Sequence, residues 1–460
     1  MDILLTDTMV IPSAPEGTVI RQGAVAIHND RIVAVGKTEE LEQQYPNSMK
    51  IPLANRAVMP GLINAHTHSV LNVLRGTVEN GGAVNRVYGY MVPITFAMSD
   101  EDRQALATVG CLEAIRSGTT TMVDPLRFVP SYAQAMSDTG LRLYLAESAA
   151  DAVTPEIRTS GYRYDRNWGE AFLERTFSLI EGFHNTQNGR VQCMVAAHAT
   201  DNCSPWMLDT LRELAVSRGL RRTIHLAQSA QEVQQVKNLT SGSTPVEYLR
   251  DHGWLGDDVL GAHCTHCSDH DIGLLAETGT SMAHCPASSS RRGFHTLANM
   301  PRLIDAGVNV TLGTDNMSED MFEALRIGII LNRGLREDGE DPTPIDMLTW
   351  ATTNGARALG RDDLGALTPG MKADLIVVRL DRPHLSPLLD TISSLVHYGQ
   401  AADVESVMID GEWVMKNSVV QTLDEETVIN KAQEAAIHAW RALHERWPDI
   451  PIPSPFQDLI

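Results

Sequence analysis

The stretch AVMPGLINAHTH, residues 57–68, is an apolar run that ends in two histidines one residue apart. Residues i and i+2 of an extended strand point to the same side, so His66 and His68 can converge on one point. Taken alone the pair is a weak signal, because two polar residues in a turn give the same pattern. Its meaning depends on whether the rest of the chain supplies more residues of this kind.

The residues that follow repeat this rhythm. Seven more short apolar runs appear, and stretches with helical spacing, such as 100–117 and 205–219, separate them. Strands that are almost continuously apolar and alternate with helices are typical of a parallel sheet covered by helices. Eight such units predict an α/β protein with a (β/α)8 TIM-like barrel. A doubly wound open sheet is the rival, but it normally has a glycine-rich turn after its first strand, where this chain has His-Thr-His. The seven runs are 119–124, 142–148, 191–199, 222–228, 259–264, 280–286 and 309–315.

The two ends of the chain have a different pattern. ILLTDTMVI and AVAIHNDRIVAVG near the start, and ADLIVVRLD and VESVMIDGEWVMKN near the end, are short, partly alternating β segments. Within the last of them, Asp410-Gly411 is a strong hairpin signal. We expect both ends to form one small β-sandwich domain. The predicted division is 1–56 and 370–423 for that domain, 57–369 for the barrel, and 424–460 for a helix with a Pro-rich arm.

Several of the inferred strands end in residues that can bind metals. His225, His263 and Asp315 stand at the C-terminal ends of their runs, as do His198 and His284. Active sites of (β/α)8 barrels lie at this end of the strands, so these side chains are expected to meet. His198 or His284 taken singly could be an ordinary buried residue. Three imidazoles and a carboxylate suit zinc or iron(II), which lowers the pKa of a bound water to about 7.

Longer blocks around these residues resemble one family. PGLINAHTHS (60–69), HLAQS (225–229), AHCTHCSDHDIGLLAETGTSMAHCPASSSRRG (262–293) and DAGVNVTLGTDN (305–316) look like the corresponding blocks of the amidohydrolase superfamily. The branch that they resemble contains cytosine, guanine and S-adenosylhomocysteine deaminases and the triazine hydrolases. The resemblance covers almost the whole chain, including the split β domain.

The resemblance implies a set of roles. His66, His68, His225 and Asp315 would hold one divalent metal ion, zinc in the first place with iron as the alternative. His263 would hydrogen-bond the water or the substrate, and Asp315 would also take the proton of that water. The fourth strand ends in VAAHAT, without the carboxylated lysine of two-metal members, so a single ion is expected. The partner is expected to be a small-molecule substrate, and the protein a homo-oligomer, a dimer or larger, as related enzymes often are.

One position departs from the family. Deaminases of this branch usually have Glu three residues after the fifth-strand histidine, and this chain has Gln228. Gln cannot transfer a proton to a ring nitrogen, and such acid catalysis is worth about 10²–10⁴-fold in rate. One function left open is a hydrolase of a small heterocyclic or amide-like substrate, at a C–N bond or a comparable leaving group such as halide. The other is a deaminase of an aromatic nitrogen heterocycle in which His263 or His284 replaces the acid. A non-catalytic scaffold is disfavoured because all four ligands are present.

Four residues are candidate substrate contacts. They are His198, His284, Asn316 beside the last ligand, and Arg75. Arg75 opens the segment 75–98, which is long for a loop and is expected to act as a lid that helps set specificity.

Two polar stretches nearby have simpler explanations. Ser318, Glu319 and Asp320 are predicted to be an ordinary helix start with acids in its first turn. The run SSSRRG (288–293) is expected to be a polar loop.

The composition excludes several classes. A formal net charge of −21 argues against a nucleic-acid partner, which requires clusters of Lys and Arg. No apolar run approaches the roughly 18–20 residues of a membrane helix, and MDILLTDTMV does not resemble a secretion signal. We therefore expect a cytoplasmic protein with no membrane partner. The six cysteines are too sparse for a disulfide framework, and Cys264 and Cys267 lack the second pair of a zinc knuckle.

Overall fold

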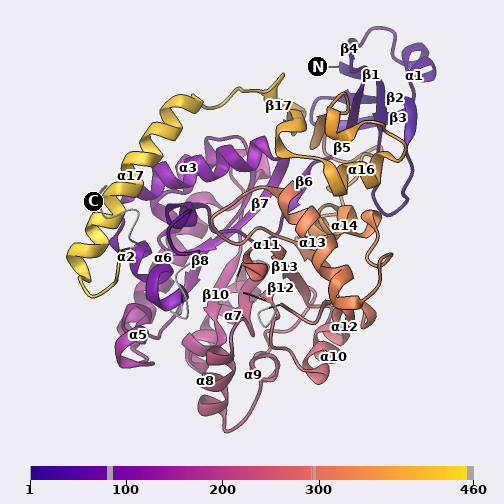
Figure 1. Cartoon of the computed structure of the whole chain (residues 1–460). Helices are drawn as coiled ribbons and strands as arrows, with labels where there is room; N and C mark the ends of the chain where they lie inside the picture. The colour runs from indigo at the N-terminus through magenta and orange to yellow at the C-terminus, as the bar shows by residue number, and fades with distance from the viewer. Residues whose placement is uncertain (1, 80–85, 292, 294–296, 453–460) are drawn as a thin grey trace.

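Eight parallel strands form the barrel that the sequence predicted (Figure 1). The structure, a computed structural model, describes residues 2–79, 86–291, 293 and 297–452. Each barrel strand pairs with the next one along the chain, and the short strand β9 (Val191–Cys193) pairs with β8. The barrel strands are β6 (Leu62–Asn64), β7 (Thr119–Leu126), β8 (Arg142–Ala149), β10 (Val195–Ala199), β11 (Arg222–Leu226), β12 (Val259–His263), β13 (Ser281–His284) and β14 (Val310–Leu312).

Backbone hydrogen bonds between the first and last strands close the barrel. Ala65 N–H donates to the carbonyl of Leu312 at 2.9 Å, and Asp315 N–H donates to the carbonyl of His66 at 3.0 Å. His68 N–H then donates to the carbonyl of Asp315 at 2.7 Å. The closure therefore brings segments about 250 residues apart into register, and it does so at the residues predicted to bind metal.

Helices cover the outside of the barrel, and many begin at a capping residue. Ser99 and Ser268 each form a capping box, in which the serine side chain and the third helical residue satisfy each other's backbone N–H. The predicted C-terminal helix, α17 (Glu425–Arg446), packs on α3 along one side of the barrel (Figure 1). The other helices are α2 (Val92–Ala97), α3 (Asp100–Arg116), α4 (Ala133–Ser137), α5 (Ile157–Ser160), α6 (Arg166–Phe183), α7 (Pro205–Arg218), α8 (Ala230–Thr240), α9 (Pro245–Asp251), α10 (Asp269–Thr278), α11 (Pro286–Ser290), α12 (Met300–Asp305), α13 (Met321–Arg336), α14 (Pro344–Trp350), α15 (Thr353–Ala358) and α16 (Thr391–Tyr398).

A second sheet joins the two ends of the chain, as predicted (Figure 1). Its strands follow the order β18-β17-β16-β15-β5-β1-β2-β3, and β4 also pairs with β1. Asp410 and Gly411 form the predicted hairpin turn, with φ of 51° and 77°. The strands are β1 (Asp2–Val10), β2 (Ile20–His28), β3 (Arg31–Lys37), β4 (Met49–Pro52), β5 (Arg56–Pro60), β15 (Leu375–Arg379), β16 (Val404–Ile409), β17 (Glu412–Lys416) and β18 (Val419–Val420), and α1 (Thr38–Gln44) packs beside β2 and β3.

The strands of the barrel alternate between its inside and its outside. On β7, Val123 belongs to the hydrophobic cluster inside the barrel, whereas Met122 and Leu126 belong to the core beneath the helices. On β10, Ala196 points inward in the same way. On β10 this alternation places His198, two residues after Ala196, on the inner side at the mouth of the barrel.

The segment 75–98, predicted to be a long loop, is partly helical. A π-helical turn spans Val87–Met91, and α2 follows it directly. Residues 80–85, and residues 453–460 of the predicted Pro-rich arm, lie outside the described part of the chain. The proposed role of 75–98 as a lid therefore stays a prediction.

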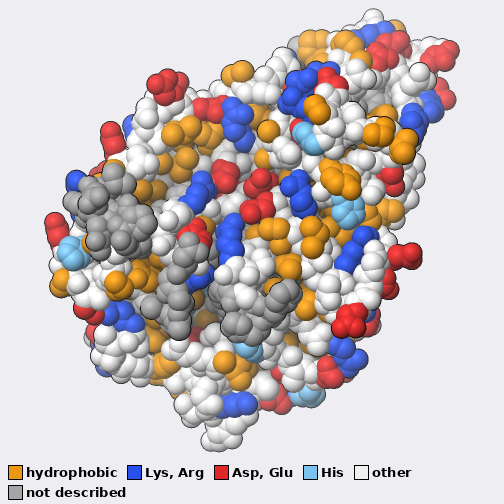
Figure 2. Space-filling model, in the orientation of Figure 1, with side chains coloured by type: hydrophobic (Ala, Val, Ile, Leu, Met, Phe, Trp, Pro, Cys, Tyr) orange, Lys and Arg blue, Asp and Glu red, His pale blue; other side chains and the backbone are white. Residues whose placement is uncertain are grey.

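No described helix has both the length and the apolar character needed to cross a membrane. On the face shown in Figure 2, acidic and basic side chains are interspersed over both the barrel and the β domain. The six cysteines form no disulfide within the described residues.

Candidate active site

Five side chains from four strands converge at the C-terminal mouth of the barrel. The ring centroid of His66 lies 4.7 Å from that of His68, 4.9 Å from that of His225 and 5.3 Å from that of His263. Asp315, just after β14, completes the group, and every member is at most 6% exposed. The residues predicted from the sequence to form the metal site therefore lie together.

The spacing of the donor atoms suits one cation. Nε2 of His68 lies 3.0 Å from Nε2 of His225, and Oδ1 of Asp315 lies 3.5 Å from Nε2 of His68 and 3.7 Å from Nε2 of His66. Donors placed tetrahedrally about 2.1 Å from a zinc ion are about 3.4 Å apart. Both ring nitrogens of His66 and Nδ1 of His68 are buried without a hydrogen-bond partner among the described residues. A divalent metal ion between the donors explains why Nε2 of His66 has no hydrogen-bond partner.

The imidazoles are held in the form that binds metal. Nδ1 of His225 donates to the backbone carbonyl of His198 at 2.6 Å, which leaves Nε2 of His225 as the unprotonated nitrogen. Burial, and then the neighbouring His66, lower the pKa of His225 to about 3 and hold the pKa of His68 well below its usual value. Burial alone would raise the pKa of Asp315, but the surrounding histidines, His263 first, hold it well below the ordinary value. The site thus presents His68 and His225 as neutral imidazoles beside an ionised carboxylate.

Two members of the site have a left-handed backbone. His263 has φ of 77° and Asp315 has φ of 69°. Non-glycine residues in this region cost energy and are often found at functional sites. At Asp315 the bonds to the backbone of His66 and His68 fix this conformation, so barrel closure also aims the carboxylate.

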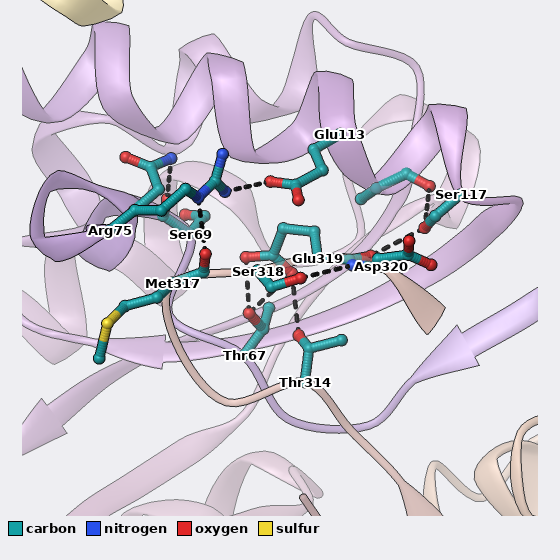
Figure 3. Close-up of polar contacts among 12 residues, drawn as sticks. Thr67, Ser69, Arg75, Glu113, Ser117, Thr314, Met317, Ser318, Glu319 and Asp320 are labelled. Atoms are coloured by element: carbon teal, nitrogen blue, oxygen red, sulfur yellow. Dashed lines mark hydrogen bonds and ion pairs between the residues drawn. The ribbon is translucent and has the colours of Figure 1, made fainter. Parts of the chain in front are cut away.

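The buried Glu319 links the two segments of this closure and is not part of the first turn of α13, where the sequence placed it (Figure 3). Its carboxyl group is buried and lies 2.7 and 2.8 Å from Oγ1 of Thr67, 3.1 Å from Oγ1 of Thr314 and 3.1 Å from Nδ2 of Asn64. Asp320 is the N-cap of α13, so it lies just before the first turn in which the sequence placed it. Glu319 therefore joins the segment carrying His66 to the segment carrying Asp315.

Gln228 lies beside His263. Its Nε2 donates to Nε2 of His263 at 3.1 Å, so that imidazole nitrogen is unprotonated in this arrangement. Behind it, the buried Glu232 accepts the backbone N–H of Gln228 at 2.6 Å and that of Ala227 at 2.9 Å. Burial, and then the charge of Asp201, raise the pKa of Glu232 to about 8. Glu232 fixes the loop that carries Gln228, but its carboxyl group is committed to backbone amides.

The four predicted substrate contacts have different positions. The ring of His198 lies 5.1 Å from that of His225, at the edge of the histidine cluster. Nδ2 of Asn316 lies 3.5 Å from Oγ of Ser288, which in turn donates to Oδ2 of Asp315 at 2.5 Å. The substrate roles of these residues stay predictions.

The other two lie apart from the cluster. His284 lies 3.4 Å from Asn332 on α13, with its ring 6.4 Å from that of Trp350 on α14. Arg75 forms an ion pair with Glu113 and donates to the carbonyl of Met317 at 2.7 Å (Figure 3). The side chains of His284 and Arg75 thus form contacts with other residues of the protein, and nothing in the sequence indicated these contacts.

The barrel and its histidine–aspartate cluster define a metal-dependent hydrolase. Residues 57–414 match the Amidohydrolase family, and residues 23–47 match the imidazolonepropionase-like composite domain of bacteria. The chain belongs to the amidohydrolase family, and it is a hydrolase of carbon–nitrogen bonds that uses a divalent metal ion.

Individual relatives and structures agree with this assignment. The chain is 32% identical to a 5'-deoxyadenosine deaminase from Methanosarcina mazei, over 95% of this chain and 98% of the relative. It is 33% identical to a 5-methylthioadenosine/S-adenosylhomocysteine deaminase from Pelotomaculum thermopropionicum, over 94% and 96%. An adenosine deaminase from Xanthomonas campestris with bound zinc superposes with a TM-score of 0.85 at 26% identity, over 96% and 99% of the chains. The fold alone is shared with the atrazine chlorohydrolase of Arthrobacter aurescens (TM-score 0.82, 23% identity, 94% and 100%).

Proposed function

We propose that this chain binds a single zinc ion and hydrolyses a C–N bond, or a bond to a comparable leaving group, in a small nitrogen heterocycle. The observation that carries the proposal is the convergence of His66, His68, His225 and Asp315 on one point. A divalent cation at this point supplies a water ionised at neutral pH and polarises the substrate. Iron(II) is the alternative cation, because the same donors suit it.

The residues around the cation have distinct tasks in this proposal. Asp315 is ionised, and Ser288 donates to its Oδ2 while its Oδ1 faces His66 and His68. Asp315 is therefore placed to take a proton from the attacking water. His263 holds an unprotonated Nε2 against the amide of Gln228, so it can accept that proton in turn and deliver it to the leaving group.

Deamination of an adenosine-type base is the second candidate, and the named relatives favour it. Ring protonation by the residue at position 228 is not available in this chain, because that residue is Gln. His263 is the titratable group in contact with the side chain of Gln228 and is the proposed substitute. Substrates that need no ring protonation, such as amides, carbamates and halogenated rings, would avoid the difficulty.

The test combines metal analysis with a substrate screen. Purified protein is analysed for bound metals, stripped with a chelator, and reloaded with zinc or iron(II). Turnover is then measured on 5'-deoxyadenosine and other aminated heterocycles, amides, carbamates and halotriazines. We expect activity to disappear with the metal and to return with one ion per chain.

Two variants test the ligand set. His66→Ala and Asp315→Ala should lose both bound metal and turnover, whereas His270→Ala, which changes an exposed histidine outside the cluster, should keep both. Turnover in metal-free protein, or normal metal content in both ligand variants, would refute the proposal.

We also propose that the active form is a cytoplasmic homo-oligomer, a dimer or larger. The family resemblance supports this, and light scattering of the metal-loaded protein tests the assembly. A monomer at all concentrations would contradict it.

The division of the chain into segments 1–56, 57–369, 370–423 and 424–460 is likewise a proposal, which limited proteolysis can test.

A further inference from the structure

Arg127 extends from the barrel strand next to β6 toward the mouth of the barrel. It follows β7 directly, two residues after Pro125 and four after Val123, which points into the barrel. The next residue, Phe128, packs in the opposite direction, with its ring under the guanidinium groups of Arg103 and Arg175 at 4.1 and 4.8 Å. The alternation of the strand therefore directs Arg127 inward, on the side of the catalytic residues.

The guanidinium of Arg127 is buried, and within the described part of the chain it forms no ion pair with a carboxylate. The side chain is 2% exposed, and its Nε and Nη2 have no hydrogen-bond partner among the described residues. The nearby carboxylate of Glu147 is already engaged, by Arg175 at 2.7 Å and by the backbone N–H of Val129 at 2.9 Å. Burial lowers the pKa of Arg127 to about 10, so the group is still positive at pH 7. A buried cation with two donors unused by the described residues is costly to the fold, and a bound anionic group would offset that cost.

The surroundings of Arg127 belong to the catalytic mouth. Burial, and then the positive charge of Arg127, hold the pKa of His198 well below its usual value, and the same charge contributes to the low pKa of His225. Tyr88, from the segment predicted to act as a lid, is another close neighbour. The guanidinium thus lies near the histidine cluster, on the side of His198.

The two donors without a partner form one edge of the guanidinium. Elsewhere in the molecule the same edge binds carboxylates in a fork: Nε and Nη2 of Arg56 bind Glu405 at 2.9 and 2.8 Å, and those of Arg222 bind Asp258 at 2.9 and 2.7 Å. A carboxylate matches this fork in shape and charge.

We infer that Arg127 recognises a carboxylate group carried by the substrate, on the His198 side of the barrel mouth. This inference rests on the proposed function, since it names the class of substrate: a nitrogen heterocycle with an acidic substituent. Neutral heterocycles would leave the cation unpaired and bind more weakly.

Binding measurements test the inference without requiring turnover. The dissociation constants of a pyrimidine carboxylate and of its carboxamide are measured by calorimetry on the zinc-loaded protein. We expect the carboxylate to bind about 10- to 100-fold more tightly, as for a hydrogen bond to a charged group. In Arg127→Met, which keeps the volume and removes the charge, this ratio should fall toward one. Arg163→Met, which changes an exposed arginine outside the mouth, should keep it.

Additional variants and ligands in the same binding experiment distinguish the possible results. Arg127→Lys keeps the charge but loses the fork, and an intermediate ratio is expected. Equal binding of both ligands by the wild type, or an unchanged ratio in a folded Arg127→Met, overturns the inference. Acetate binding as tightly as the pyrimidine carboxylate would show that the guanidinium takes free anions, which also overturns it. Failure of zinc-dependent turnover on every substrate, with the binding ratio intact, would instead contradict the proposed function.

Discussion

Gln228 is the residue that separates the two reactions proposed for this chain. It lies 3.1 Å from His263 and is fixed from behind by Glu232, so its position is well defined. An amide in this position can orient a substrate but cannot give up a proton. The local geometry would accept a carboxyl group, because Gln and Glu have the same shape.

Gln228→Glu should therefore increase ammonia release from an aromatic amine. An acid beside His263 at this position should raise kcat/KM by the order of 10²-fold, the lower end of what general acid catalysis contributes. Ammonia release from 5'-deoxyadenosine and from an aminotriazine measures the effect. Metal content serves as the control, since the substitution leaves the ligands in place. An unchanged or lower rate at full metal content would mean that Gln228 does not limit deamination.

Glu319 makes stability depend on pH. Burial, and then the charge of Glu113, raise its pKa well above the ordinary value of 4.5, so the folded protein keeps a proton that the unfolded chain releases. The contribution of Glu319 to stability is full below pH 4.5 and is lost as the pH rises toward its folded pKa.

Glu319→Gln has no proton to release at this position, so its stability should lack the pH dependence that Glu319 causes. Relative to the wild type, the free energy of unfolding of the variant should rise by up to about 1.4 kcal/mol per pH unit above pH 4.5. Urea unfolding between pH 5 and 8, with both proteins in the same metal state, measures the difference. Glu323→Gln, on the neighbouring and partly exposed face of α13, is the control. Parallel curves for the wild type and Glu319→Gln would contradict the assignment.

At the scale of elements, local pattern predicted most of the architecture. The eight apolar runs became barrel strands because each is long enough and bounded by helices with clear caps. The ligands followed from the same pattern, since strand ends meet in a barrel. The burial of Glu319 and of Arg127 was not predicted, because it depends on contacts with residues far away in the chain. A glutamate two residues before a helix looks like part of its first turn until barrel closure brings Thr67 within hydrogen-bond distance.

The contact between β6 and β14 leaves no room for a side chain at Gly313. A Cβ there would lie 2.7 Å from the backbone oxygen of His66 and 3.0 Å from its nitrogen. Gly313→Ala must push the two segments apart, so we expect a loss of about 1–3 kcal/mol in stability and about tenfold weaker metal binding. Competition with a chelator measures the metal affinity.

Gly182→Ala, on the exposed side of α6, has no atom within 4 Å of the added carbon and is the matched control. It should leave metal affinity unchanged and stabilise the helix slightly, by up to about 1 kcal/mol. Equal metal affinity in the two variants would mean that barrel closure does not position the ligands.

At the scale of the whole molecule, a buried charge network joins the barrel to the β domain. Arg142, at the start of β8, binds Asp374 at 2.8 and 3.1 Å and Asp410 at 2.6 Å. Lys372 adds a further contact to Asp410 at 3.0 Å. These residues lie at the N-terminal end of the barrel strands, opposite the metal site. Stability and chemistry are therefore assigned to the two ends of one barrel, as is general for this fold.

Arg142→Met should lower the stability of the protein but leave its metal affinity almost unchanged. Removing the guanidinium leaves Asp374 buried without its main partner, which should lower the free energy of unfolding by about 3–5 kcal/mol. Metal affinity should stay within a factor of about two, because the ligands lie at the other end of the strands. Arg163→Met, which breaks only exposed ion pairs with Glu156 and Asp165, should cost at most about 1 kcal/mol. If Arg142→Met unfolded as readily as Arg163→Met, the network would not hold the β domain to the barrel. If Arg142→Met also lost the metal, the two ends of the barrel would be coupled, because a change at the N-terminal end of β8 would then have altered the positions of His66 and Asp315.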